Sequence, residues 1–282
     1  MKPAAFAYHR VDTLPEALDR LAELGGDAKV LAGGQSLVPM MNFRLARPAA
    51  LVDITRVGEL RGMERTGSTL RIGALTTHAE VERAGEALDG GFGILRHAAA
   101  WVGHMPIRSR GTFGGSIAHA DPAAEWCMLA VALDATIEIA GPDGERELAA
   151  EDFLLGYYTT ALEPGEVITA VRFPAPCRRA AIEEFARRHG DFAVVAAVVA
   201  LPDGGAPRVV IGGVDEVPVR ARDAERVLAQ GGPSPEAFAE AARAAAAEID
   251  PVSDLHAGAD YRRELTEVLV ERALAAAVVD GS

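Results

Sequence analysis

Apolar residues recur with two different periods along this chain of 282 residues, and turn residues separate the segments. Leu14, Leu18 and Leu21 follow helical spacing, which predicts a helix that ends at Gly25-Gly26. Short apolar runs between turn residues predict strands. In the first part of the chain these strands are expected at 29–32, 50–53, 136–140, 145–148 and 167–173, with a hairpin within 60–73.

Polar residues mark further helix starts. Thr13 to Glu16 and Thr77 to Glu80 each have the spacing of a capping box. Ser36 is expected to cap a short helix through 40–44, and apolar spacing predicts helices at 94–102 and 126–133. Residues 104–115 are rich in glycine, arginine and proline, so we expect a loop there that is too long for a simple connector.

Pro174-Ala175-Pro176 is the best candidate for a linker. Beyond it the pattern predicts strands at 192–201 and 208–211, followed by helices at 221–229, 235–249 and 261–279. Strands followed by a run of helices are typical of an α+β domain. The sequence therefore predicts a boundary near residue 176 and a small α+β domain at 177–282.

Two glycine pairs far apart in sequence are the strongest indication of function. The first lies in Val30-Leu31-Ala32-Gly33-Gly34-Gln35-Ser36-Leu37, and the second in Arg110-Gly111-Thr112-Phe113-Gly114-Gly115-Ser116. Glycine lets the backbone approach a ligand closely, and successive N–H groups in a tight turn form an anion-binding concavity. Gly-Gly is also common in ordinary turns, so the two loops together, rather than either alone, favour a nucleotide diphosphate.

Composition limits the classes of partner. The formal net charge of −13 argues against nucleic acid and anionic membranes, although Arg108 and Arg110 leave a local basic pocket open. Two cysteines, Cys127 and Cys177, cannot supply the four thiolates that usually hold an iron–sulfur cluster. They favour a reducing, cytoplasmic compartment over a disulfide, and no membrane insertion is expected, since the longest apolar run is shorter than the ~20 residues of a membrane span.

The common catalytic motifs are absent. The sequence contains no phosphate-binding G-x-x-x-x-G-K-[ST], no G-x-G-x-x-G after a strand and no G-x-S-x-G. His97, His104 and His119 lack the spacing of metal ligands, which favours locally hydrogen-bonded histidines. Asp121 either caps the following helix or belongs to a site, whereas Glu125 could accept hydrogen bonds from ribose or ribityl hydroxyl groups. The segment 187–191 is either a solvated turn or an edge of the cofactor site.

Four segments in this order resemble the FAD-binding medium subunit of molybdenum hydroxylases, of the aerobic carbon monoxide dehydrogenase type. Xanthine dehydrogenase carries a similar region as an internal domain. The resemblance covers essentially the whole chain. The segments are Ala32-Gly33-Gly34-Gln35-Ser36-Leu37, Ile107-Arg108-Ser109-Arg110-Gly111-Thr112-Phe113-Gly114-Gly115-Ser116, His119-Ala120-Asp121-Pro122-Ala123-Ala124-Glu125 and Arg187-Arg188-His189-Gly190-Asp191-Phe192-Ala193.

The resemblance implies an α+β fold. It consists of a two-subdomain FAD-binding domain of the vanillyl-alcohol oxidase type over 1–176, with subdomains at about 1–56 and 57–176, and a C-terminal domain over 177–282. It also implies roles for residues. The FAD diphosphate would be held by the two glycine loops, and the same groove would be lined by the strand before the first loop. These residues are Lys29, Val30, Leu31, Ala32, Gly33, Gly34, Gln35, Ser36, Leu37, Gly111, Thr112, Gly114, Gly115 and Ser116.

Four further residues receive roles from the same resemblance. Glu125 would lie near the ribityl chain, Val102 and Ile168 near the flavin or adenine, and Phe192 near the isoalloxazine ring. Glu184 lies near a position that is a lysine in some relatives. No catalytic residue and no metal ligand is implied in this chain.

The resemblance further implies an electron-transfer subunit in a complex that is a dimer of heterotrimers. Substrate would be oxidised at a molybdopterin cofactor in a large subunit, and electrons would cross [2Fe–2S] clusters in a small subunit to FAD here and then to an external acceptor. Two alternatives remain open: a self-sufficient FAD-dependent oxidase of the same fold, which predicts turnover by the isolated chain, and a non-catalytic assembly protein, which predicts no bound flavin. The sequence names neither the substrate nor the acceptor.

Overall fold

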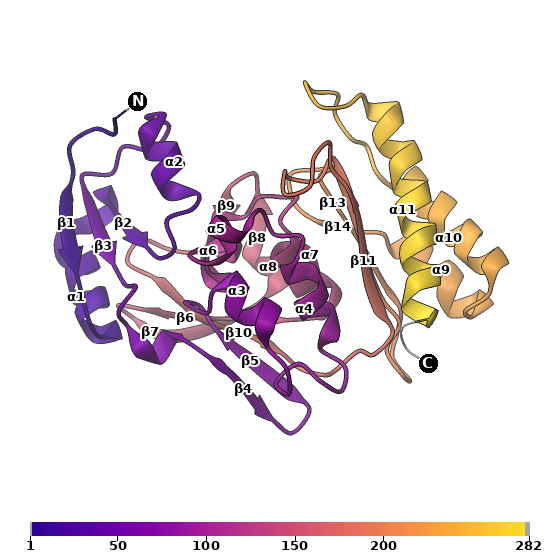
Figure 1. The fold of residues 1–282 in the computed structure, drawn as a ribbon, viewed down its shortest axis with the longest axis horizontal. Coiled ribbons are helices and arrows are strands. Elements are labelled where there is room, and N and C mark those ends of the chain that lie inside the picture. The colour runs from indigo at the N-terminus through magenta and orange to yellow at the C-terminus, as the bar shows by residue number, and fades with distance from the viewer. Residues whose placement is uncertain (1, 280–282) are drawn as a thin grey trace.

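The computed structural model describes residues 2–279, in which three larger β-sheets follow one another along the chain (Figure 1). The first sheet is parallel, and the second and third are antiparallel. Three clusters of buried apolar side chains correspond to the first sheet, to the layer between the second and third sheets, and to the far face of the third. The chain is thus a mixture of helix and sheet in segregated layers, which confirms the expected α+β class.

The first sheet places the first glycine loop at the end of a strand. β3 pairs in parallel with both β1 and β2, and α1 buries Ala17 and Leu21 in the same core. The chain runs from β2 through the glycine loop and α2 back into β3, as the sequence predicts. The elements are β1 (Ala7–Arg10), α1 (Leu14–Leu24), β2 (Ala28–Leu31), α2 (Leu37–Asn42) and β3 (Ala50–Asp53).

The second sheet is antiparallel and has the strand order β4-β5-β10-β6-β7. Its central strand β10 arrives late in the chain and pairs with β5 on one side and β6 on the other. The ladder with β6 is irregular between Ile168 and Ala170. The strands are β4 (Met63–Thr66), β5 (Thr69–Gly73), β6 (Thr136–Gly141), β7 (Gly144–Ala149) and β10 (Val167–Phe173).

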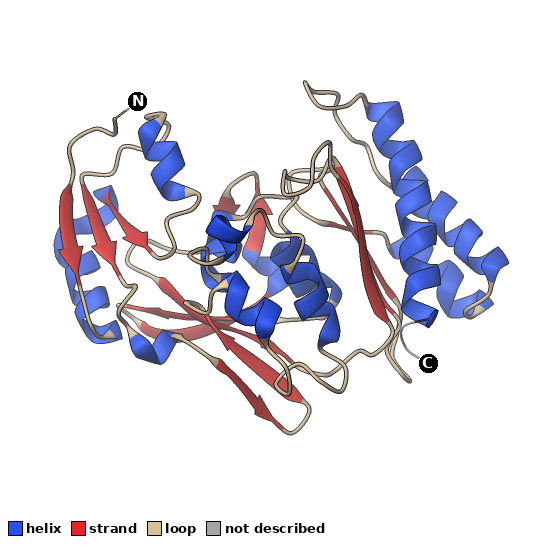
Figure 2. Cartoon of the chain, viewed as in Figure 1, coloured by secondary structure: helices blue, strands red, loops and turns tan. Residues whose placement is uncertain are grey.

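Short helices fill the layer between the second and third sheets (Figure 2). Every residue of α7 is buried, which is characteristic of a helix packed on all sides. The second glycine loop leads into α6, directly before α7. The elements of this layer are α3 (His78–Arg83), α4 (Gly93–Ala99), α5 (Met105–Arg108), α6 (Phe113–His119), α7 (Glu125–Ala132) and α8 (Ala150–Phe153), with a small ribbon of β8 (Leu154–Gly156) and β9 (Thr159–Thr160).

The third sheet is buried on both faces. Along β11, Ala180 and Ile182 belong to the core of the middle layer, whereas Ala181 between them belongs to the core beneath the C-terminal helices. This alternation is the two-residue period of a strand. The elements are β11 (Ala180–Phe185), β12 (Val195–Ala200), β13 (Arg208–Gly212), β14 (Val219–Arg220), α9 (Arg222–Gly231), α10 (Pro235–Glu248) and α11 (Ala259–Val279).

Most of the expected elements are confirmed, and both bonds of the Thr77–Glu80 capping box are present. The loop expected over 104–115 is wrong, because α5 and the start of α6 occupy it. The composition of residues 104–115 does not indicate α6. The first N–H groups of this helix, those of Phe113 and Gly114, donate to the carbonyl groups of Thr76 and Ala74. These partners lie far away in sequence, so no local pattern could reveal them.

Four local expectations also need correction. Ser36 precedes α2 but makes no side-chain capping bond, and the strand expected over 192–201 begins only at Val195. Asp121 does not cap α7, because its carboxylate accepts the N–H of Ala123, and α7 begins only after Ala124. The helix expected over 94–102 ends at Ala99. The sequence analysis missed the short elements β1, α8, β8, β9, β11 and β14.

Candidate functional site

The two glycine loops lie against each other although almost 80 residues separate them. A Cβ atom built on Gly33 would overlap the carbonyl oxygen of Arg110 and lie 2.8 Å from the Cα atom of Gly111. Such a separation is too short for any side chain. The backbones therefore touch, and Gly33 is required because only glycine permits this approach. The structure brings together the two loops that the sequence predicts to act on one ligand.

The first loop offers free hydrogen-bond donors. Within residues 2–279, no hydrogen bond uses the backbone N–H groups of the four successive residues Gly33, Gly34, Gln35 and Ser36. Each residue from Leu31 to Leu37 is half-buried, so these amides line a partly enclosed surface. Gly34 has a φ of +73°, a left-handed conformation that turns the backbone sharply here. A run of free N–H groups in such a turn is suited to an anionic group.

The second loop differs because its own amides are already used. The N–H groups of Phe113 and Gly114 bond the carbonyl oxygens of Thr76 and Ala74 at 2.8 and 2.9 Å. The N–H group of Gly115 donates to Oγ1 of Thr112, the N-cap of α6, at 3.1 Å. Of this loop, Gly115 and Ser116 are half-buried, whereas residues 111–114 are buried. The second loop therefore contributes mainly a close-packed wall.

A buried histidine supports this wall. Trp126 donates its indole N–H to Nδ1 of His78 at 2.9 Å, and a Cβ atom on Gly111 would lie 2.7 Å from Nε2 of the same ring. Burial, and to a smaller extent the nearby charge of Arg108, lower the pKa of His78 to about 4, so the ring is neutral at pH 7. The sequence analysis missed His78 and Trp126; the Thr77 capping box, directly beside His78, was the available signal.

The basic residues of the second loop have separate roles. Arg108 is buried and pairs with Glu82 through two bonds of 2.9 and 3.3 Å, and it donates to the carbonyl of Gly103. The guanidinium of Arg108 is therefore held by protein partners and adds no free charge to the site. Arg110 is exposed, and among the described residues no ion pair involves its side chain. The local basic pocket suggested by the sequence therefore reduces to Arg110.

Glu125 begins α7 and is 8 % exposed. Burial, with a smaller contribution from the charge of Asp121, raises the pKa of its carboxyl to about 7. Asp121 itself bonds the N–H of Ala123 and lies 3.4 Å from the hydroxyl of Tyr158. A buried carboxyl with a raised pKa is a common feature of functional sites.

The remaining predicted residues occupy different surroundings. Val102 and Ile168 are core side chains of the middle layer, and Lys29 is exposed on β2. Phe192 is 62 % exposed. Its loop packs against the segment before α5. The ring of His189, in the loop, and the ring of Trp101, in that segment, lie edge-on with centroids 6.1 Å apart. The cofactor contacts expected for these four residues stay predictions.

The arrangement fits a dinucleotide diphosphate. Four successive N–H groups of the first loop have no partner among the described residues, and the backbone of the second loop lies in contact with Gly33 beside them. The diphosphate is anionic and takes several N–H donors at once. Among the described residues, no cluster of three or more His, Cys, Asp or Glu side chains is arranged to hold a metal ion. Cys127 and Cys177 are separate buried thiols.

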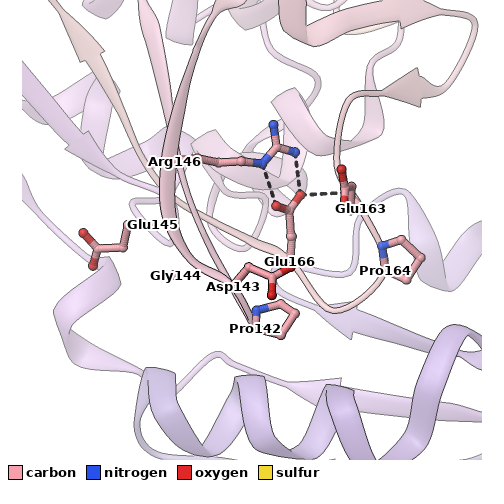
Figure 3. Close-up of a pocket in the computed structure, with 8 residues that line it drawn as sticks. All are labelled: Pro142, Asp143, Gly144, Glu145, Arg146, Glu163, Pro164 and Glu166. Atoms are coloured by element: carbon pink, nitrogen blue, oxygen red, sulfur yellow. Dashed lines mark hydrogen bonds and ion pairs between the residues drawn. The ribbon is translucent and has the colours of Figure 1, made fainter.

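A pocket elsewhere does not compete with this site. It lies between the β6–β7 turn and the segment before β10, and Arg146 and Glu166 face each other across it (Figure 3). Arg146 makes bonds of 2.6 and 2.7 Å to the two carboxylate oxygens of Glu166. Since this pair neutralises its own charges, the pocket offers an anion no free cation. No helix within residues 2–279 has both the length and the apolar character needed to cross a membrane.

Comparison with known families identifies two matching domain models. Residues 4–176 match the FAD binding domain in molybdopterin dehydrogenase. Residues 180–277 match the CO dehydrogenase flavoprotein C-terminal domain. Together the two matches extend over nearly the whole chain.

Individual relatives are similar over their full length. The chain is 41 % identical to the 6-hydroxypseudooxynicotine dehydrogenase complex subunit alpha of Paenarthrobacter nicotinovorans, covering 99 % of this chain and 96 % of the relative. It is 37 % identical to the carbon monoxide dehydrogenase medium chain of Hydrogenophaga pseudoflava, covering 98 % of each.

Solved structures have the same fold. A carbon monoxide dehydrogenase from Hydrogenophaga pseudoflava that lacks the Mo-pyranopterin moiety matches with a TM-score of 0.94 at 37 % identity, covering 99 % of both chains. Quinoline 2-oxidoreductase from Pseudomonas putida 86 matches with a TM-score of 0.94 at 37 % identity, covering 100 % of both chains.

Proposed function

This chain belongs to the family of FAD-binding subunits of molybdopterin dehydrogenases, and we propose that it is the electron-exit subunit of a heterotrimeric molybdenum hydroxylase. The family membership confirms the resemblance seen in the sequence. It makes the chain an oxidoreductase subunit whose cofactor is FAD. The self-sufficient oxidase and the assembly protein are less consistent with full-length relatives that are subunits of larger dehydrogenases.

The run of free amides in the first glycine loop is the observation that carries this proposal. The N–H groups of Gly33 to Ser36 donate to the FAD diphosphate, and the side chain of Ser36 adds a hydroxyl donor. The second loop holds the first in place through the contact of Gly33 with Arg110 and Gly111. Gly115 and Ser116 present the half-buried end of the second loop to the same ligand.

The other predicted residues complete the proposed site. Lys29, Val30, Leu31 and Ala32 line the approach along β2, and Leu37 continues the loop into α2. Glu125 binds hydroxyl groups of the ribityl chain. Val102, Ile168 and Phe192 lie near the rings. We place the boundary between the FAD-binding domain, with subdomains at about 1–56 and 57–176, and the C-terminal domain at residues 176 and 177.

The chemistry is divided between cofactor and protein. FAD, when bound, supplies the electron transfer between the iron–sulfur clusters of a partner and an external acceptor. The chain binds and orients the cofactor and holds no residue for substrate chemistry. Its two cysteines are too few for an iron–sulfur cluster. As the family implies, we assign the clusters to a small partner subunit and the molybdopterin to a large one. We place the complex, a dimer of heterotrimers, in the cytoplasm.

The first test is the visible absorbance of the purified chain, with the released chromophore identified by mass. Flavin absorbance and release of FAD are expected, with about one FAD per chain after reconstitution. Adding the partner subunits with substrate is then expected to bleach the flavin. A colourless chain that also fails to take up added FAD would overturn the proposal, and substrate turnover by the chain alone would favour the oxidase.

A further inference from the structure

The loop between β11 and β12 reaches from the C-terminal domain to the FAD-binding domain. It covers residues 186–193. Gly190 has a φ of +86°, and a Cβ atom on it would overlap the imidazole ring of His104, so the backbone of the loop packs directly on that ring. The neighbouring His189 forms the ring pair with Trp101. The tip of the loop is therefore fixed against the segment before α5.

This contact brings the loop close to the second glycine loop in the chain. The carbonyl group of His104 accepts the N–H of Ile107 at 2.8 Å, at the start of α5. The carbonyl group of Ile107 accepts the N–H of Gly111 at 2.7 Å, at the start of the glycine loop. Phe192, which is expected near the isoalloxazine ring, lies in the loop that packs on His104. The position of this loop therefore bears on the cofactor site.

Two successive residues of α11 hold the two ends of the loop. At its start, the ring of Tyr261 lies edge-on to the ring of Phe185, with centroids 6.2 Å apart. At its end, Nη1 of Arg262 donates to the carbonyl oxygen of Val194 at 2.6 Å. The N–H of Val194 donates to the carbonyl oxygen of Phe185 at 2.7 Å. These contacts close the neck of the loop and fasten it to the helix.

Arg262 also fastens the chain directly after β13. Its Nη1 donates to the carbonyl oxygen of Gly213 at 2.6 Å. A Cβ atom on Gly213 would lie 2.8 Å from the carbonyl oxygen of Val194, so these two segments are in contact. The N–H of Gly213 donates to the carbonyl oxygen of Pro122, between α6 and α7, at 3.2 Å. One guanidinium therefore links the neck of the loop to the segment that follows the second glycine loop.

The guanidinium of Arg262 is buried and held in one orientation. Its side chain is 7 % exposed, and Nη2 pairs with Oδ2 of Asp254 at 2.8 Å. Burial raises the pKa of Asp254, but the N–H groups of Ala257 and His256 and the charge of Arg262 together lower it to about 2, so the carboxylate is ionised at pH 7. Within residues 2–279, Nε of Arg262 has no hydrogen-bond partner, so the two terminal nitrogens orient the group. A buried ion pair is weak evidence for stability, so we take its contribution to be the arrangement of the groups that it binds.

We propose that Arg262 is a positioning residue, which holds the loop over residues 186–193 closed against the FAD-binding domain and thereby limits the exposure of the flavin ring to solvent. The arginine acts through the neck of the loop and through Phe192. The N–H groups of Gly33 to Ser36 belong to a different part of the fold, so diphosphate binding does not depend on Arg262. This role rests on the proposed function, and it gives the C-terminal domain a task at the flavin.

Trypsin cleavage of the cofactor-free chain tests the neck of the loop. Arg187 and Arg188 are exposed in the loop, so cleavage after them, identified by mass, reports local opening. We expect Arg262→Met, which loses hydrogen bonds from a charged donor, to be cleaved there at least about tenfold faster than the wild type. Cleavage after Arg243, exposed on α10, measures general unfolding in the same sample. Equal acceleration at both places, or no acceleration in the loop, would overturn the proposal.

Arg263→Met is the matched control. Arg263 is the next residue of α11, and its ion pairs with Asp250 and Asp260, at 2.7 and 3.3 Å, lie outside the loop. This variant loses the same charged group from the same turn of the helix. We expect cleavage of the loop at the wild-type rate.

Asp254→Asn is a milder second variant, which serves where Met at position 262 prevents folding. The amide keeps an oxygen that can accept the N–H groups of His256 and Ala257, and it loses the carboxylate oxygen that pairs with Arg262. We expect loop cleavage about threefold faster, because only one ion pair is lost. A loop that is cleaved as slowly as in the wild type would contradict the role of Arg262.

Iodide quenching of flavin fluorescence tests the effect on the cofactor. The sample is the chain reconstituted with FAD, alone or in its complex with the partner subunits. For Arg262→Met we expect the quenching constant of bound flavin to rise at least about threefold as the loop opens. The dissociation constant of FAD should change less than about threefold, because the hydrogen bonds of the first glycine loop are kept. Arg263→Met should match the wild type in both measurements.

The outcomes separate this role from the proposed function. Bound FAD whose quenching is unchanged in Arg262→Met would overturn the positioning role and leave the proposed function intact. A chain that binds no FAD, alone or in the complex, would overturn both.

Discussion

The two glycine loops look alike in sequence but perform different work. In the first loop, four successive N–H groups are free and the residues are half-buried. In the second, the N–H groups of Phe113, Gly114 and Gly115 are already bonded within the protein, and the backbone is mostly buried. Glycine allows a close backbone contact in both loops, but only the first loop keeps a run of N–H groups free for a ligand.

A glycine pair therefore indicates that the backbone closely approaches another group, but it does not indicate whether that group is a ligand or the protein itself. Gly114 meets Ala74, and Gly111 meets His78, both inside the protein. Gly33 meets the backbone of the other loop. Because only the first loop has free N–H groups, we expect substitutions there to affect FAD more than folding, and those in the second loop to affect folding first.

The largest effect is expected for Gly33→Ala. Its Cβ atom would overlap the carbonyl oxygen of Arg110 and force the loops apart. We expect the affinity for FAD to fall at least about 100-fold, which corresponds to roughly 2.7 kcal/mol of binding free energy. The checks are FAD per chain and the unfolding temperature of the cofactor-free protein.

Gly26→Ala is the control for this change, because a Cβ atom at Gly26 meets nothing within 4 Å. It should keep FAD. If Gly33→Ala retained full affinity, the contact between the loops would not matter for the cofactor, and the comparison would fail.

Acid is expected to weaken the second loop through His78. The pKa of His78 is about 4 in the folded protein, against 6.5 when unfolded. Between these values the unfolded state holds a proton that the folded state lacks, so stability is complete above pH 6.5 and falls as the pH approaches 4. The shift corresponds to about 3 kcal/mol. Denaturant unfolding of wild type and His78→Asn at pH 7 and pH 4.5 measures it, and equal pH dependence in both would contradict the assignment.

A smaller loss of stability is expected for Gly114→Ala. The new Cβ atom would lie 2.5 Å from Cβ and 2.8 Å from Cα of Ala74. Overpacking of this kind costs about 1–3 kcal/mol. Gly93→Ala in α4 is the control, since a Cβ atom there meets nothing within 4 Å. Thermal unfolding of the cofactor-free proteins should separate them, and a loss of FAD without any loss of stability in Gly114→Ala would break the distinction between the loops.

The smallest effects are expected for the hydroxyl residues Thr112 and Ser36, which test the difference between the two loops. Thr112→Ala removes the N-cap of α6 and should cost about 1 kcal/mol of stability. Ser36→Ala removes a side chain with no capping bond, so stability should stay unchanged while FAD affinity falls about fivefold, the effect of one hydrogen bond. Paired melting and FAD titration of both variants measure this. The reverse pattern would assign the binding role to the second loop.

Local patterns predicted the first loop and its setting well. The short apolar run before Gly33, the capping box at Thr77 and the hairpin within 60–73 all depend on contacts within a few residues, and the structure contains each of them. The α+β class followed from the order of such signals, and the FAD-binding family from the resemblance of the four segments quoted above. In such places sequence and structure agree because the stabilising contacts are local.

Local sequence patterns do not predict contacts between residues that are far apart in the chain. No local pattern shows that Ala74 and Thr76 stabilise the start of α6, so the composition of residues 104–115 predicts a loop there. β11 was missed because its outer half, Glu183-Glu184-Phe185, lacks an apolar run. The setting of Arg262 is also non-local, because it donates to the carbonyl groups of Val194 and Gly213, which lie far away in the sequence.

The two-faced burial of β11 has a consequence for how such chains can be recombined. Ala180 and Ile182 contribute to one core and Ala181 to the other, so residues on a single strand must match both the helical layer before it and the helices after it. A chimera that joins the first 176 residues of this chain to the C-terminal part of a relative would therefore create a mismatched seam along this sheet. Exchanging α4 and α7, the helices that pack on this sheet, together with the C-terminal part is expected to restore the fit, so the segment to exchange is larger than a single domain.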